Sequence, residues 1–143
     1  MCIRDRITEE ELAELEAGLA RSQDALDHPL DFLRADEHLH KTITKAARNP
    51  IMSRVIDSIS RLLLVSRNRT VEIPGVRAQT LEDHRAIVAA LKEQDPEAAQ
   101  AAMLEHLNHV EQGLLDSHSS VADTTAGATG SGVPYKNVEG SNA

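Results

Sequence analysis

The amino-acid sequence predicts an all-α protein, an antiparallel helical bundle with a disordered C-terminal tail. Apolar residues recur every three or four positions in five segments, capping residues or prolines separate these segments, and none of them has a convincing strand pattern. The chain has 143 residues, of which 41% are hydrophobic and 27% charged. This length suits one modest globular domain and leaves no room for a second.

The first two predicted helices have clear boundaries. Thr8-Glu9-Glu10-Glu11 is a capping box in front of an apolar stripe, and it opens a helix over about residues 8–26. Asp27-His28-Pro29 ends this helix. The second helix ends before Asn49-Pro50, because the residue preceding a proline disfavours helical geometry. Its inward-facing residues recur at helical spacing and are Phe32, Leu33, Leu39, Ile43 and Ala47.

Three further helices are predicted. The third covers about residues 50–69, with a proline in its first turn. Ile73-Pro74-Gly75 then forms a loop, and Thr80 caps the fourth helix. Asp95-Pro96 combines a cap with a first-turn proline and opens the fifth helix at about 96–117. The apolar stripe of the third helix consists of Met52, Ile56, Ile59 and Leu63.

These segments divide the chain into three parts. Residues 1–7 are expected to be an unstructured or artefactual start, because they lack the pattern that follows and the apolar core of a secretory signal. Residues 8–118 form the helical domain. Residues 119–143 are rich in Ser, Thr, Gly and Ala and contain four of the seven glycines, so we expect a disordered tail.

Composition excludes several classes of function. The net charge of -8 opposes a phosphate backbone, so these residues are poor candidates for binding nucleic acid themselves. Cys2 is the only cysteine, which excludes a disulfide framework and a thiolate zinc site. No run of about 18 apolar residues could span a membrane. We therefore expect a cytoplasmic protein whose partner is a small molecule or another protein.

Four side chains that can bind a metal fall on the apolar stripes of three predicted helices. Asp36 and His40 lie one turn apart on the second helix, and His84 lies within the apolar arc of the fourth. His106 lies at the edge of the stripe of the fifth. Buried ionisable groups are costly unless they are paired or ligated. Three imidazoles and one carboxylate would suit zinc or another divalent transition ion.

Other interpretations of these residues stay open. Each histidine could instead be a core residue that is hydrogen-bonded without any metal. A carboxylate-bridged di-iron bundle needs two Glu-x-x-His pairs, and only Glu37–His40 has that spacing. A catalytic metal site needs a separate base or nucleophile, and the sequence offers no obvious one. His38 and His109 point away from the stripes, and we expect both to face solvent.

Three segments together carry the motifs of a known family. The first joins Asp36-Glu37-His38-Leu39-His40 to Ala46-Ala47-Arg48-Asn49-Pro50. The second runs over 81–91 and the third over 95–107. In order, they resemble the D-x-x-F-H and A-x-x-N-P segment, the E-H-x-x-I-x-x-A helix, and the closing D-x-x-x-A, M-x-x-H-L helix of the FCD domain. This all-helical, effector-binding domain belongs to FadR-type regulators of the GntR family, and the resemblance covers about residues 8–117.

The resemblance implies a metal-dependent domain that senses a small organic acid, and not an enzyme. Arg67 continues the stripe of the third helix and is our candidate for holding the far end of such an effector. Leu39 stands where the family usually has Phe, a conservative change that should leave the ligands usable. The implied ligands of a divalent ion, zinc or nickel, are Asp36, His40, His84 and His106.

The resemblance also implies a longer parent protein. Family members carry a winged helix-turn-helix and at least one further effector-domain helix ahead of these motifs, so we expect an N-terminally truncated domain. DNA binding would then belong to the parent. Effector binding would change how two DNA-reading heads are spaced in a homodimer. The alternatives are a metal-free helical dimerisation module and a metal-dependent enzyme.

Overall fold

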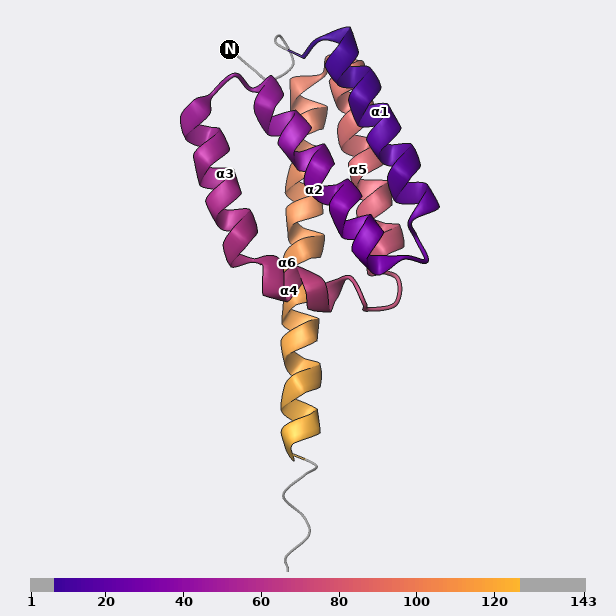
Figure 1. Ribbon diagram of the computed structural model, residues 1–143, viewed down its shortest axis with the longest axis vertical. Coiled ribbons are helices and arrows are strands. Elements are labelled where there is room, and N and C mark those ends of the chain that lie inside the picture. Colours follow the sequence, from indigo (N-terminus) through magenta and orange to yellow (C-terminus); the bar gives the residue numbers. More distant parts are fainter. Residues whose placement is uncertain (1–6, 127–143) are drawn as a thin grey trace, which may run out of the picture.

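The structure, a computed structural model, describes residues 7–126, and this part of the chain contains six α-helices and no strand. The helices are α1 (Glu9–Asp24), α2 (Pro29–Ala46), α3 (Pro50–Leu62), α4 (Leu64–Thr70), α5 (Val76–Lys92) and α6 (Pro96–Ala126). Figure 1 shows α1, α2, α5 and α6 side by side as an antiparallel bundle, with α3 standing at its edge beyond α2. The predicted all-α class is confirmed.

The start of α1 follows the capping box. The Glu11 backbone N–H donates to Thr8 Oγ1 at 3.1 Å, and the Thr8 N–H donates to Glu11 Oε2 at 3.0 Å. Ile7 corrects one expectation, because it was assigned to an unstructured start. In the structure Ile7 and Leu12 pack against the same core cluster, as in a hydrophobic staple around a helix N-terminus. Residues 1–6 lie outside the described residues.

The third predicted helix is in fact two helices. The expected single helix over about 50–69 breaks at Leu63, where α3 ends and α4 begins. Neither glycine nor proline marks this break, so the sequence carried no signal for it. Tertiary packing decides it instead, because the turn lets α4 cross the base of the bundle and contact α6 (Figure 1).

Two other helix boundaries differ from their predicted positions. α5 begins at Val76 and not near Thr80, because Gly75 adopts a left-handed conformation (φ 85°) that turns the chain directly into the helix. α6 continues to Ala126 and not to about residue 117, so the first part of the tail expected to be disordered is helical. No glycine or proline interrupts the sequence between Gly113 and residue 127, which removes the local reason to stop. The remainder of that tail, residues 127–143, lies outside the described residues.

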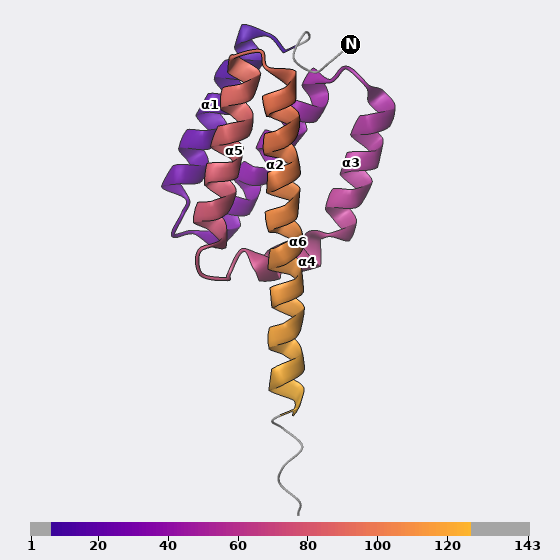
Figure 2. The same ribbon diagram turned by 180° about the vertical axis from the view of Figure 1, so that it is seen from behind.

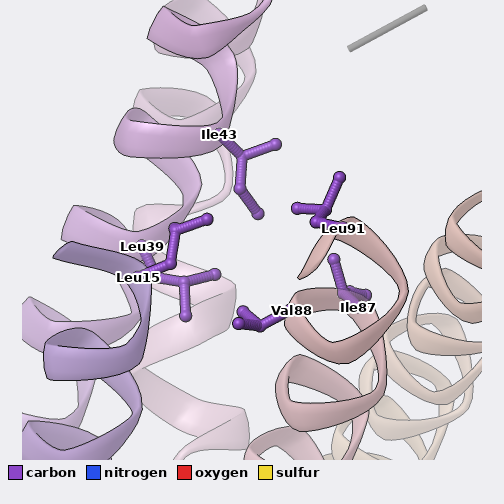
Figure 3. Close-up of a cluster of buried hydrophobic side chains, with 6 residues drawn as sticks. All are labelled: Leu15, Leu39, Ile43, Ile87, Val88 and Leu91. Atoms are coloured by element: carbon purple, nitrogen blue, oxygen red, sulfur yellow. The ribbon is translucent and has the colours of Figure 1, made fainter. Parts of the chain in front are cut away.

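The core consists of two clusters at different heights of the bundle. The larger cluster joins α1, α2 and α5, and Figure 3 shows its side chains converging from both sides. Its members are Leu15, Leu39, Ile43, Ile87, Val88 and Leu91. The smaller one contains Ala25, Phe32, Val71 and Leu81. Residues 33–38 of α2 and 82–86 of α5 therefore separate the two clusters along each helix.

α6 lies along α5 and extends past the rest of the bundle (Figure 2). On its inward face His106 is buried, and Ala99, Ala102 and Met103 are partly buried against the larger core cluster. Within residues 7–126, no helix is long and apolar enough to cross a membrane.

Candidate metal centre

Three histidines from three helices lie close together inside the bundle. The ring centroids of His40 on α2 and His84 on α5 are 5.1 Å apart. The His106 ring on α6 lies 4.8 Å from that of His84 and 5.4 Å from that of His40. One nitrogen from each ring lies within 4.8 Å of the other two. Nitrogens bound to one zinc ion sit about 2.0–2.1 Å from it, so a small movement of these rings would bring all three into coordination range.

His84 is the member of this group with the clearest unmet requirement. Its side chain is 0% exposed, and neither ring nitrogen has a hydrogen-bond partner. A buried polar group without a partner costs roughly 1–3 kcal/mol, and native structures keep few of them. A metal ion would satisfy one of these nitrogens. The donor set therefore fits a divalent transition metal, for which neutral imidazole is a common ligand.

Asp36 stands beside the histidines. Its Oδ1 lies 3.5 Å from His84 Nε2 and 3.7 Å from His40 Nε2. Its other oxygen, Oδ2, is paired with the guanidinium of Arg67. The structure thus brings all four predicted ligand residues to one place, with the three histidines as the compact group and Asp36 at its edge.

Arg67 reaches this site from α4. The sequence placed it on a continuous third helix, whereas the break at Leu63 redirects the helix that carries it. Its side chain is largely buried, and this burial lowers the pKa of the guanidinium from its usual value. Arg67 therefore lies at the predicted position near the metal ligands, but its partner in the structure is Asp36.

The electrostatics of the site favour neutral imidazoles. Burial, together with the neighbouring His40, His106 and Arg67, lowers the pKa of His84 to about 2. Burial also lowers the pKa of His40 and of His106, although Asp83 opposes the shift at His106. Metal ions bind the neutral imidazole, so protons compete weakly for these ligands at neutral pH.

The depressed pKa values predict that the metal-free protein loses stability as the pH falls. In the unfolded chain His84 binds a proton below about pH 6.5, whereas the folded form binds one only near pH 2. The contribution of neutral His84 to the unfolding free energy is therefore fully present above pH 6.5 and is lost as the pH falls below that value. His84 alone should remove about 2 kcal/mol of the unfolding free energy between pH 7 and pH 5.

Urea denaturation with a chelator present at several pH values measures this loss. His84→Leu is the comparison, because it removes the titrating group and should give a shallower pH dependence. Parallel curves for the two proteins would refute the assignment of the loss to His84.

Sequence reasoning missed a fifth polar group, the buried carboxylate of Asp83 on α5. Gln79 Nε2 donates to Asp83 Oδ1 at 3.0 Å, and His106 Nδ1 lies 3.3 Å from Oδ2. His109 Nδ1 lies 3.0 Å from both carboxylate oxygens, so this side chain, which was expected to face solvent, is 39% exposed and also contacts Asp83. The sequence did contain a signal for Asp83. At about 100° per residue, Asp83 points only about 40° away from Ile87, which places it at the edge of the apolar face of α5.

His38 behaves differently from His109. Its side chain is 46% exposed and its Nε2 lies 2.9 Å from Glu14 Oε1 on α1. It takes no part in the histidine group, which agrees with its predicted outward direction.

A cavity of about 240 Å³ adjoins the histidines. His40, His106 and Arg67 line its polar side, and apolar residues of α3 and α6 such as Ile59 and Val110 line the other. A second and more open pocket of about 470 Å³ shares His40 and Arg67 and lies between α2 and α3. A mostly apolar pocket with a few convergent polar groups is the usual form of a small-molecule site.

Together these features define a class of protein: a helical small-molecule-binding domain with a histidine-rich candidate metal centre beside its pocket. The chain belongs to the FCD domain family, whose sequence profile matches residues 2–109. FCD domains are effector-binding regulatory domains of GntR-family transcriptional regulators. This confirms the resemblance inferred from the motifs.

Curated relatives agree with the family. The uncharacterized HTH-type transcriptional regulator YcbG of Bacillus subtilis strain 168 is 32% identical over 112 residues, which are 78% of this chain and 46% of YcbG. The HTH-type transcriptional repressor NanR of Cronobacter sakazakii is 26% identical over 108 residues, covering 74% of this chain and 42% of the repressor. NanR of Escherichia coli K12 is 28% identical over 114 residues, covering 74% and 41%.

The chain therefore spans less than half the length of each of these relatives. All three are named as regulators of transcription. The comparisons thus group the chain with domains of transcriptional regulators and not with enzymes.

Proposed function

We propose that this chain is the metal-dependent, small-carboxylate-sensing domain of a cytoplasmic GntR-family DNA-binding regulator. The observation that carries the proposal is His84, a fully buried imidazole without a hydrogen-bond partner, grouped with two other imidazoles whose pKa burial lowers. Zinc or nickel is the proposed ion, since both accept imidazole and carboxylate ligands. The proposed ligands are Asp36, His40, His84 and His106.

The adjoining cavity supports a small organic acid as effector. The bound ion would supply positive charge to hold one carboxylate of that acid. Arg67 lines the same cavity and can donate to carboxylate oxygens in a bidentate manner, so it would hold another oxygen of the effector. The apolar wall from α3 and α6 would exclude water from the remainder of the molecule.

The position of Arg67 also suggests how binding could be transmitted. Arg67 lies on α4, which directly follows α3 and packs on α6. An effector that draws Arg67 towards itself would shift α4, and with it the packing of α3 on the bundle. We propose that this shift alters the spacing of two DNA-binding modules, each in a winged helix-turn-helix of the parent chain.

The exposed apolar side chains of α3 and α4 support a homodimer and favour the second candidate function, a metal-free helical dimerisation module. No residue of α3 or α4 is buried. Ile51, Leu62 and Val65 are 74%, 81% and 64% exposed. Apolar surface of this kind marks an interaction site more often than a free surface.

Metal content and effector response test the proposed function together. The purified 143-residue chain should carry about one zinc or nickel ion per chain by elemental analysis. In a panel of small mono- and dicarboxylates, some acids should raise the melting temperature of the metal-loaded protein and not of the chelator-treated protein. A chain that binds no divalent ion but sediments as a stable dimer would contradict the sensing role and support the dimerisation module. Consumption of an acid during the assay would support an enzyme.

A further inference from the structure

Asp83 forms a buried polar junction between α5 and α6. The residue is 7% exposed, and its carboxylate has three partners, one on its own helix and two on α6. Gln79 lies one turn before it on α5. His106 and His109 lie one turn apart on α6, so that both rings reach the same carboxylate through Nδ1.

This geometry determines which nitrogen of His106 can bind a metal. An ionised carboxylate only accepts hydrogen bonds, so the Nδ1 of His106 must carry the proton in its contact with Asp83. The Nε2 is then the unprotonated nitrogen. Neutral imidazole binds a metal through its unprotonated nitrogen, and a partner on the other nitrogen orients the ring.

We propose that Asp83 is a positioning residue for the metal centre, which holds His106 in the tautomer and ring orientation that present Nε2 to the ion. This inference rests on the proposed function for its metal, but the orientation of His106 can be measured without one. Among the described residues, Asp83 is the only carboxylate with a contact to the His106 ring. His84, by contrast, has no hydrogen bond at either nitrogen.

The same carboxylate connects the proposed ligand to the pocket wall. Gln79 and His109 both line the 240 Å³ cavity, while Asp83 itself does not.

The test is Asp83→Asn, which keeps the size of the side chain and removes its charge. The affinity for Zn²⁺, measured by competition with a chromophoric chelator, should fall by about 10–100-fold, as is usual when the partner of a metal-bound histidine is lost. The absorption spectrum of the Co²⁺-loaded variant should change as well, because the His106 ring is no longer held in one orientation. Glu82→Gln is the matched control. It removes a carboxylate charge at the neighbouring position of α5, where the exposed Glu82 side chain pairs with Arg85 and with no histidine, and it should retain affinity within a few-fold.

A second measurement needs no variant. Nitrogen-15 NMR of the metal-free wild-type chain should show His106 with its proton on Nδ1. A proton on Nε2, or wild-type Zn²⁺ affinity and an unchanged Co²⁺ spectrum in Asp83→Asn, would overturn the positioning role. A wild-type chain that binds no divalent ion would overturn the proposed metal-dependent function instead. The tautomer of His106 would still decide whether Asp83 orients that ring.

Discussion

Replacing His84 with leucine should abolish stoichiometric metal binding while leaving the metal-free protein as stable as the wild type or more stable. The side chain is 0% exposed and neither nitrogen is hydrogen-bonded, so leucine loses no hydrogen bond and removes an unsatisfied polar group. The metal-free variant should gain up to about 2 kcal/mol of unfolding free energy at pH 7. It should lose the stabilisation that metal gives the wild type, about 2.7 kcal/mol when free metal is at 100 times its dissociation constant.

The test is specific because the substitution should raise the stability of the metal-free protein but remove the stabilisation by metal. Urea denaturation with chelator and with added Zn²⁺, together with elemental analysis, gives all four stabilities and the metal content. His38→Leu is the matched control, because His38 is a half-exposed histidine outside the group and its loss should leave metal binding intact. Full metal content in His84→Leu would remove His84 from the ligand set.

Truncating Leu39 to alanine should cause the largest loss of stability in the core, about 2–5 kcal/mol. Leu39 is 0% exposed and packs in the cluster that joins α1, α2 and α5 (Figure 3). Its side chain also lies 4.0 Å from the position that a Cβ on Gly18 would take, so the two helices are close here and little can move to fill a cavity. A loss of this size is a large part of the 5–15 kcal/mol that stabilises a typical domain.

Leu104→Ala is the control for this prediction. It deletes the same atoms from a side chain that is 60% exposed on α6 and should change stability by no more than about 0.5 kcal/mol. Equal effects of the two substitutions, measured by urea denaturation at constant metal concentration, would show that the cluster around Leu39 is not the stabilising core.

Much of the candidate site was predictable because helical periodicity is a local property. Asp36 and His40 are one turn apart, and His84 falls among apolar residues, so both helices were expected to turn these groups inward. The structure places them together with His106. Their role as metal ligands stays a prediction.

Other parts of the site depend on contacts between helices and left only weak traces in the sequence. His109 lies off the apolar stripe of α6, and only the position of α5 beside it shows that Asp83 accepts its N–H. Arg67 was expected near the site for the wrong reason. A continuous third helix was assumed, whereas the break at Leu63 and the packing of α4 on α6 bring Arg67 to Asp36.

The sequence by itself determined the all-α class, the capping of α1 and the inward direction of the predicted ligands, because each follows from residues within one or two turns of each other. Only the tertiary structure decided where the third helix breaks, how far α6 extends and which partners Asp83 and Arg67 have. These features depend on the relative placement of helices distant in sequence, where contacts between neighbouring helices override local propensity. Asp83 illustrates the difference: its position in the sequence marks it as a residue at the edge of a helix face, and packing against α6 makes it the buried partner of two histidines.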